Sequence, residues 1–292
     1  MKDVLKKVYS VLPFKKQLFE TLRFFWVPPH SLYKHLHFEG IIKLKVDRGA
    51  SFSMKHHGME IENDFFWKGL TGGWEKISMK YWIELSRNSK VVLDIGANTG
   101  VYSLVTKSIN SSTKVYAFEP LSQMFKKLLF NNELNSYDIV CVEKAASDKN
   151  GKAIIYETGT DHVAAASLNA EIRHYGNLDV ETEIETITLD TFIQANNVGK
   201  IDLVKIDVET HEPNVLEGYK KYLPLHRPDF LIEVLTDEVG ERLQKIFDGL
   251  HYHYFNIDDK KGNIRKTDTI EKSEYFNYLI CTEESAKQLR LI

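Results

Sequence analysis

Cysteine is almost missing from this sequence. The 292 residues contain only Cys141 and Cys281, too few for a disulfide scaffold or a cysteine-rich zinc site. We expect both thiols to be unpaired and buried as small apolar groups, which fits a reducing compartment. The cytoplasm is therefore the expected location.

Long apolar runs are missing as well. A helix that crosses a bilayer needs about 20 consecutive apolar residues, and no stretch of this chain approaches that length. The first residues also lack a continuous apolar core followed by a cleavage site. We therefore expect neither a transmembrane segment nor a signal peptide.

The chain also lacks an excess of positive charge. The chain has 38 Lys and Arg against 41 Asp and Glu, a net charge of −3, whereas domains that bind nucleic acids are usually basic. We expect no nucleic-acid partner. A hydrophobic content of 43% with 27% charged residues is typical of an ordinary globular protein.

The length suits one catalytic domain with an N-terminal extension, and we place the boundary between residues 1–87 and 88–292. The extension starts with a basic, amphipathic segment, 1–26, which we interpret as a helix docked on the domain or on a partner subunit. Contact with a membrane surface is the alternative. A half-buried antiparallel strand set is expected in 37–64. The aromatic, glycine-containing stretch 65–74 fits either core packing or a lid.

From residue 90 onward, strand-like and helix-like segments alternate, which predicts a doubly wound, Rossmann-like α/β domain. The predicted strands are 91–95, 115–118, 139–143, 201–206, 230–234, 252–257 and 275–281. Residues 152–187 interrupt the alternation with two further strand-like segments and a polar loop. We expect substrate contacts in this insertion.

One stretch organises the catalytic domain. Residues 91–95 are almost entirely apolar, as in a strand covered on both faces, and a glycine turn and a helix follow. Gly96 and Gly100 let the backbone turn sharply and let a ligand approach closely. The helix over 101–108 would direct its free N–H groups toward that ligand.

The residues around the turn indicate which ligand it binds. A dinucleotide fingerprint needs a glycine where this chain has Asn98, which argues against NAD. Asp94 is a poor neighbour for a diphosphate but a good one for a cationic amino acid. Glu119, at the end of the next strand, can accept hydrogen bonds from both ribose hydroxyls. Together these two acids predict a binding site for S-adenosylmethionine (SAM).

The motifs also resemble a known family. The chain contains DIGANTG from Asp94, AFEP from Ala117, KAASD from Lys144, TLD from Thr188 and KIDVE from Lys205. In this order, over residues 88–235, they resemble the FkbM family of SAM-dependent methyltransferases. Thr210 stands where that family usually has glycine.

The resemblance implies a class I methyltransferase sheet of seven strands, the last two forming an antiparallel hairpin. It implies methylation of a hydroxyl group on a sugar, a glycan or a natural product. It also implies that the loop after the third strand contacts adenine, although the same loop could be a simple turn. The predicted cofactor-binding residues are Asp94, Gly96, Ala97, Asn98, Gly100, Glu119, Ala146, Ser147 and Asp148.

Four titratable groups follow the fourth strand, where a methyl acceptor should lie: Asp207, Glu209, His211 and Glu212. We predict that they position an acceptor hydroxyl or remove its proton, because crowded carboxylates can raise one another's pKa. Stabilisation of a helix N-terminus, with Thr210 as N-cap, and metal binding are the second and third interpretations.

Other interpretations stay open at this point. An NAD-dependent oxidoreductase and a non-catalytic binding protein that keeps the fold are the alternative functions. Three histidine pairs have spacings that could bind metal, at 35 and 37, 56 and 57, and 251 and 253, but no clear third ligand accompanies them, so we predict no metal. Oligomeric state is not indicated.

Overall fold

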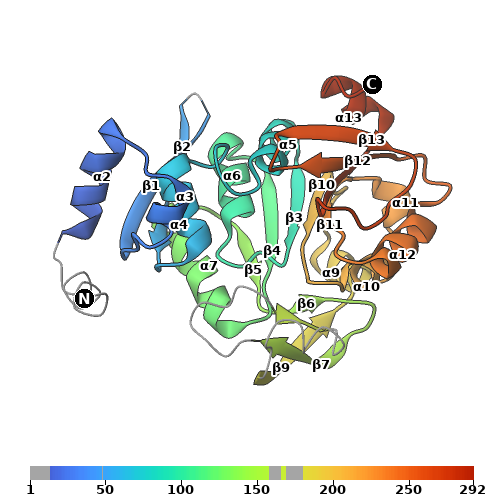
Figure 1. The fold of residues 1–292 in the computed structure, drawn as a ribbon. Coiled ribbons are helices and arrows are strands. Elements are labelled where there is room, and N and C mark those ends of the chain that lie inside the picture. Colours follow the sequence, from blue (N-terminus) through green and yellow to red (C-terminus); the bar gives the residue numbers. More distant parts are fainter. Residues whose placement is uncertain (1–13, 48, 158–165, 169–179) are drawn as a thin grey trace.

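The computed structural model describes residues 14–47, 49–157, 166–168 and 180–292. Its centre is an eight-stranded sheet in the order β13-β12-β14-β11-β10-β3-β4-β5 (Figure 1). The strands are β3 (Val91–Ile95), β4 (Lys114–Phe118), β5 (Val140–Val142), β10 (Leu203–Ile206), β11 (Asp229–Glu233), β12 (His253–Asp258), β13 (Asn263–Thr267) and β14 (Asn277–Cys281).

The sheet has the predicted doubly wound form. Strands β5, β4, β3, β10 and β11 are parallel, and β14 runs antiparallel between β11 and β12. The seven predicted strands and the antiparallel end are confirmed. The sequence did not predict β13, which adds an eighth strand antiparallel to β12. Most of its residues are exposed, so it carries no apolar pattern.

Helices cover both faces of this sheet. One face packs on α5 (Lys76–Ser86), α6 (Val101–Ile109), α7 (Ser122–Leu134) and α13 (Glu283–Gln288). The other packs on α9 (Leu189–Asn196), α10 (Glu212–Glu217), α11 (Leu223–His226) and α12 (Asp237–Phe247). Val92 points into the first core and Leu93 into the second. Burial on both faces explains the unbroken apolar run of β3.

The N-terminal part lies beside the first face (Figure 1). It contains α2 (Lys15–Phe25), α3 (His30–Tyr33), the antiparallel hairpin β1 (Gly40–Asp47) and β2 (Ala50–His56), and α4 (Glu60–Lys68). The expected strand set is therefore confirmed as a hairpin. Residues 1–13 of the predicted basic helix lie outside the described residues. Because Phe52 and Leu104 share one core cluster, the hairpin and α6 pack together, and the boundary after residue 87 stays a prediction.

The aromatic stretch is part of the core. Phe65, Phe66 and Trp67 lie in α4 and are almost fully buried, which supports packing and not a lid for these three. Cys281 is buried and Cys141 half-buried, and both are free thiols. Among the described residues, no helix has the length and apolar character needed to cross a membrane.

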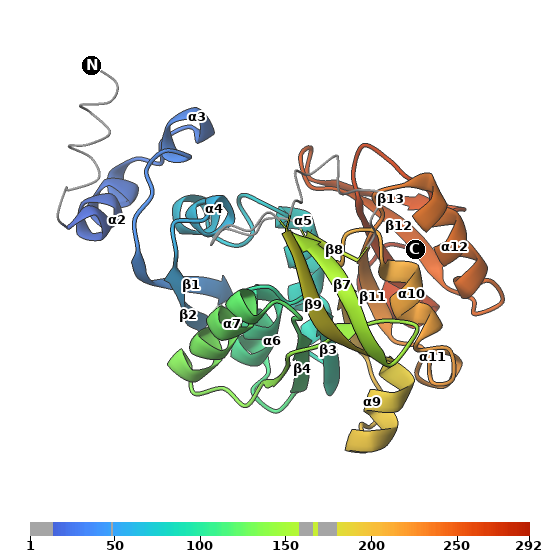
Figure 2. The same cartoon turned by 90° about the horizontal axis from the view of Figure 1, so that it is seen from below.

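The insertion after β5 forms a separate sheet, which lies toward the viewer, in front of the central strands, in Figure 2. Its strands are β6 (Ala145–Ala146), β7 (Gly151–Glu157), β8 (Ala166–Ser167) and β9 (Val180–Ile187), in the order β6-β9-β7-β8. Both strands predicted within 152–187 are present. Most of the predicted polar loop between them lies outside the described residues.

Candidate active site

The turn after β3 brings two backbone segments into contact. Gly96 has φ 76°, and a Cβ atom at this position would lie 1.9 Å from the carbonyl oxygen of Asp207. The N–H groups of Gly96 and Ala97 donate to the carbonyl of Phe118, at 3.0 and 2.9 Å. Only glycine fits this position, because any side chain would collide with the loop after β10.

Asn98 and Gly100 complete the turn in left-handed conformations, with φ 51° and 88°. Asparagine tolerates this region better than most residues with a side chain. Helix α6 begins directly after Gly100. The N–H group of Gly100 donates to the carbonyl of Ala97 at 2.8 Å, which closes the turn.

Asp94 lies beneath the turn. One carboxylate oxygen accepts from the N–H and the hydroxyl of Ser103, at 3.0 and 2.7 Å, and so stabilises the first turn of α6. The other oxygen is buried without a hydrogen-bond partner. Burial raises the pKa of this carboxyl group. Its predicted contact with a cationic amino group stays a prediction, since the structure shows it bound to the helix.

Glu119 borders the cavity described below. Its Oε2 accepts from the N–H of Asn98 at 2.9 Å and its Oε1 from the N–H of Leu121 at 3.0 Å. Burial raises its pKa to about 7, and the two backbone donors act in the opposite direction. The side chain is therefore held in one orientation, with a lone pair remaining on each oxygen for hydroxyl donors.

The loop after β5 places its three predicted residues differently. Ala146 borders the cavity described below, whereas Ser147 and Asp148 do not. The Ser147 hydroxyl lies 2.9 Å from His211 Nε2 and 3.1 Å from an oxygen of Asp148. Any contact of Asp148 with adenine stays a prediction.

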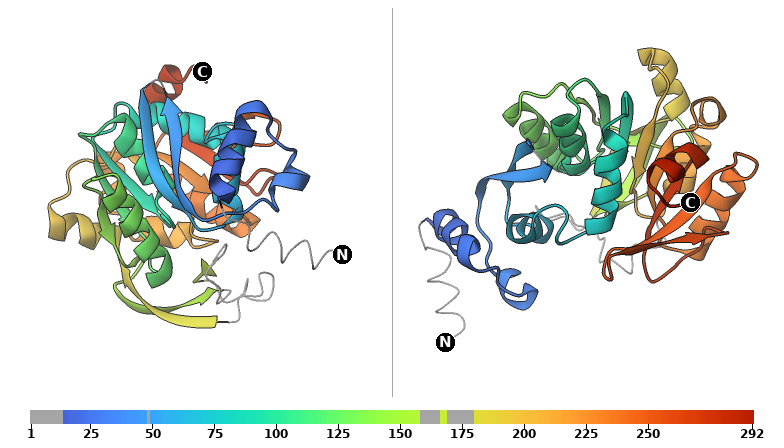
Figure 3. Two further views of the ribbon diagram at one scale, coloured as in Figure 1. Left: turned by 90° about the vertical axis from the view of Figure 1, so that its left-hand side faces the viewer. Right: turned by 90° about the horizontal axis from the view of Figure 1, so that it is seen from above.

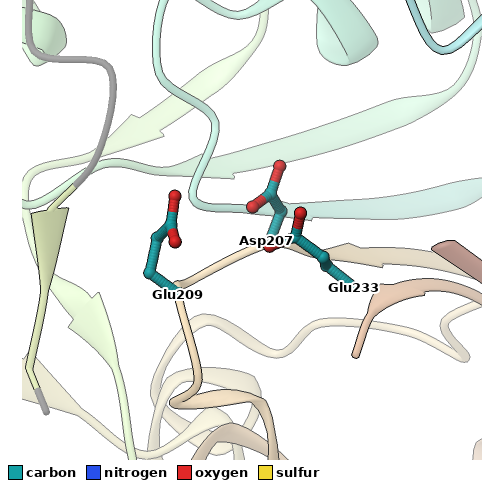
Figure 4. A group of neighbouring side chains, drawn as sticks. All are labelled: Asp207, Glu209 and Glu233. Atoms are coloured by element: carbon teal, nitrogen blue, oxygen red, sulfur yellow. The ribbon is translucent and has the colours of Figure 1, made fainter. Parts of the chain in front are cut away.

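Three carboxylates meet at the ends of β10 and β11. Asp207, Glu209 and Glu233 each place one oxygen within 4.8 Å of the others, and Figure 4 shows Asp207 beside Glu233 with Glu209 across the gap. Burial, followed by repulsion from Asp207, raises the pKa of Glu209 to about 7. Burial and the neighbouring acids raise that of Glu233 to about 10. Near neutral pH, Glu233 is thus protonated and can donate a hydrogen bond.

A buried lysine compensates this negative charge. Lys205 Nζ lies 2.8 Å from Asp207 Oδ2 and 4.8 Å from the centre of the Tyr102 ring. Burial alone would lower the pKa of Lys205, but Asp207, Asp94 and Glu75 together raise it above its usual range. The three carboxylates have the geometry of a metal site, yet a cation of the protein already occupies one side of the cluster.

Glu75 extends the cluster from the N-terminal side. It precedes α5 and accepts hydrogen bonds from the Tyr102 hydroxyl and, at 2.9 Å, from the amide of Asn277 on β14. Burial raises its pKa to about 7. Side chains from residues 75, 102 and 277 therefore meet only in the folded protein.

The segment between β10 and α10 corrects one expectation. The residue that precedes α10 as N-cap is His211 and not Thr210, and its side chain makes no capping bond. Glu209 and Thr210 have φ 54° and 76°, and a β-branched residue is strained there. This geometry explains why glycine would suit position 210.

His211 and Glu212 lie on different sides of this segment. His211 borders the cavity, and burial lowers its pKa to about 4, so its imidazole is neutral. Glu212 is fully buried, accepts from the N–H of Val208 at 3.1 Å and does not border the cavity. Burial raises its pKa to about 8. This hydrogen bond joins Glu212 to the loop after β10, and the catalytic role of Glu212 stays a prediction.

A single cavity of about 1160 Å³ joins the glycine turn to the acidic cluster. Its size allows both a nucleoside-sized ligand and a second molecule. Predicted site residues that border it are Gly96, Ala97, Asn98, Glu119, Ala146, Asp207, Glu209 and His211. The other predicted site residues do not border it: Asp94, Gly100, Ser147, Asp148 and Glu212.

Sequence reasoning missed three residues of this cavity. Glu233 ends an apolar strand just as Glu119 does, so the same signal could have identified it. Glu75 and Asn277 have no local signal, because their role depends on a contact between residues 202 positions apart in the sequence. Lys205, whose role the sequence does not indicate, also borders the cavity and pairs with Asp207.

Known proteins share these motifs. Residues 94–257 match the family described as the methyltransferase FkbM domain. The hexuronic acid methyltransferase AglP of Haloferax volcanii is 26% identical over 136 residues, 47% of this chain and 52% of that protein. The 31-O-demethyl-FK506 methyltransferase FkbM of Streptomyces tacrolimicus is 27% identical over 199 residues, 60% of this chain and 74% of that protein.

Two further matches are weaker. Methyltransferase 1 of Beauveria bassiana is 24% identical over 142 residues, 44% of this chain and 57% of that protein. The crystal structure of methyltransferase FkbM from Methylobacillus flagellatus superposes with a TM-score of 0.43 and 14% identity, covering 66% of this chain and 43% of that one. The chain spans about half the length of AglP and of methyltransferase 1. Since the family match covers more than half of its residues, the chain belongs to the FkbM methyltransferase family.

Proposed function

We propose that this protein is a SAM-dependent O-methyltransferase that methylates a hydroxyl group of a sugar, a glycan or a related natural product. The observation that carries the proposal is the cavity itself. One end holds the glycine turn and Glu119, and the other holds Lys205 with a group of carboxylates. A cofactor and a polyhydroxylated acceptor would thus lie side by side.

The residues at the first end fit SAM. Glu119 is fixed by two backbone N–H groups and offers an acceptor to each of two neighbouring hydroxyls, as a ribose requires. Gly96, Ala97 and Asn98 allow close approach of the ligand to the backbone, and Ala146 provides a small apolar wall for the adenine. When bound, SAM supplies an electrophilic methyl group.

Glu209 is the general base in this proposal. It borders the cavity, and its pKa is about 7. A large fraction of the carboxyl group is therefore ionised near neutral pH, and this carboxylate binds a proton more strongly than an ordinary glutamate does. An alcohol must lose its proton as its oxygen is methylated, and the Glu209 carboxylate would receive that proton. The neighbouring Asp207 is bound to Lys205, which makes it a better positioning group than a base.

The remaining groups suit the recognition of several hydroxyls. Asp207 and Glu75 accept hydrogen bonds, whereas protonated Glu233 and the ammonium of Lys205 donate them. A sugar ring presents neighbouring hydroxyls that do both. The names of two relatives, a hexuronic acid methyltransferase and an FK506 methyltransferase, support an oxygen-rich small-molecule acceptor.

The alternative functions have less support. Asn98 occupies the position of the glycine that a dinucleotide needs, and family membership favours methyl transfer over hydride transfer. A purely binding role does not require a carboxylate such as Glu209, whose pKa is close to neutrality, at the acceptor end of the cavity.

Titration calorimetry with SAM tests the proposal. Wild type should bind SAM, Glu119→Ala should bind it at least about tenfold more weakly, and Glu238→Ala, an exposed control on α12, should bind normally. Sugars and glycosides are then screened for release of S-adenosylhomocysteine. A folded wild type that binds NADH and not SAM would overturn the proposal.

A further inference from the structure

An exposed apolar surface lies on and just after helix α2. We call it the N-terminal patch and define it by Phe14, Leu18, Phe24, Phe25, Trp26 and Val27. Phe24 and Phe25 are 84% and 78% exposed, with ring centres 5.1 Å apart. Four consecutive apolar residues, 24–27, therefore face water.

The patch is not a by-product of a loosely attached helix. The opposite side of α2 is docked: Phe19 is buried, and its ring lies 6.0 Å from that of Phe38 and 5.6 Å from that of Trp67. Arg23 stacks on Phe66 and donates to its carbonyl. Figure 3 shows α2 on the outer side of the β1–β2 hairpin. The protein thus holds the helix firmly and presents its aromatic side outward.

Exposed aromatic runs of this kind are uncommon on soluble proteins and mark interaction surfaces. The charge around the patch indicates the partner. Residues 14–35 contain Lys15, Lys16 and Lys34 against Glu20, which pairs with Lys16. Arg23 lies on the docked side, and the whole chain has a net charge of −3. An amphipathic helix with Phe, Trp and Leu on one side and cations beside them is typical of peptides that lie in the headgroup region of an anionic bilayer.

A second copy of the chain fits this surface less well. In a two-fold symmetric dimer the patch would meet itself, so that the excess cations of both copies would face one another. An anionic lipid surface instead complements the cations and accepts the aromatic rings, and Trp26 is of the residue type that concentrates at membrane interfaces.

We propose that the N-terminal patch seats this protein on the surface of an anionic lipid bilayer, with Phe24, Phe25 and Trp26 in the headgroup region. The contact is peripheral, and it is independent of the proposed enzymatic activity. It adds a binding surface separate from the cavity.

Vesicle flotation tests the proposal with the full chain. We expect wild type to float with vesicles of phosphatidylcholine and phosphatidylglycerol, and less with pure phosphatidylcholine or at high salt. The variant Phe24→Ser/Phe25→Ser should bind at least about tenfold more weakly, because each phenylalanine contributes apolar transfer energy. Leu225→Ser is the matched control, since Leu225 is 68% exposed on α11, outside the patch.

A second readout locates the contact. Vesicles with brominated acyl chains should quench the fluorescence of the wild type more than that of Trp26→Phe, which keeps Trp74, the other exposed tryptophan, and the buried Trp67 and Trp82. Wild type that floats with neither vesicle, or binding that the double variant leaves unchanged, would overturn the proposal. So would a wild-type dimer that the double variant converts to a monomer, because the patch would then join two copies.

Discussion

Replacing Lys205 by Met should destabilise the protein, and the loss should increase with pH. The ammonium group is almost fully buried and lies 2.8 Å from Asp207 Oδ2. Asp94 and Glu75 attract it as well. The substitution leaves these acids in the protein interior without their cation, since methionine fills the space but carries no charge.

The magnitude follows from the distance and the burial. At an effective dielectric constant near 20, opposite charges 2.8 Å apart attract by roughly 6 kcal/mol. Part of this energy is consumed in dehydrating the ammonium group. We therefore expect the free energy of unfolding to fall by about 3–5 kcal/mol at neutral pH, the usual cost of removing one partner of a buried pair.

The pH dependence comes from the acids. The pKa of Lys205 is raised in the folded state, so its ammonium group is charged in both the folded and the unfolded chain below about pH 10, and its own titration adds no pH dependence there. Without this lysine, the pKa values of Glu75 and Asp94 rise further in the folded state. The unfolded chain releases those protons above about pH 4, so the stability of the variant decreases as the pH rises.

Urea unfolding at about pH 5 and about pH 8 measures both effects. The loss for Lys205→Met should be smaller at the lower pH, where the folded variant keeps protons on its acids. Lys126→Met, at an exposed position of α7, is the control and should change little at either pH. An equal loss at both pH values would refute the coupling between Lys205 and the acids.

Three further predictions address the turn and the acceptor end of the cavity. Glu209→Gln should lower kcat by about 10²-fold or more while leaving SAM affinity unchanged. In wild type, kcat should rise with pH through about 7, because only the ionised carboxylate accepts a proton. A variant that keeps the wild-type kcat would exclude Glu209 as the base. Thr210→Gly should raise the free energy of unfolding by about 1 kcal/mol in thermal unfolding, because glycine is unstrained at φ 76°, and a lower melting temperature would contradict this. Gly96→Ala should lower the free energy of unfolding by roughly 2–5 kcal/mol in the same assay, because the added methyl group would collide with the Asp207 carbonyl. Gly199 has open space around it, so Gly199→Ala should be nearly neutral. Equal effects of the two substitutions would disprove the steric argument.

Much of the cofactor end could be predicted from the sequence, because its signals are local. Gly96, Asn98 and Glu119 lie within or directly after apolar strands, and strand ends of a parallel sheet meet at one edge. The same rule applies to Asp207. It did not predict that Asp94 would bind α6, since the direction of a side chain depends on the helix that follows.

The acceptor end of the cavity and one edge of the sheet were predicted less completely, each for its own physical reason. Glu75 reaches the cavity through contacts with residues 102 and 277, and no periodicity in the sequence encodes a contact over 202 positions. The strand β13 is mostly exposed and has no apolar alternation, so only its pairing with β12 reveals it. Local patterns report burial and turns, whereas these features depend on the assembled sheet.

The close approach of Gly96 to the Asp207 carbonyl has a thermodynamic consequence. The turn that would hold the cofactor and the loop that would hold the acceptor touch through their backbones, without a side chain between them. A shift of either segment must therefore displace the other. We expect the two ligands to bind cooperatively, and linkage requires that each change the affinity of the other by the same factor. Calorimetric titrations in both orders should yield one coupling free energy, shared by the two halves of the cavity.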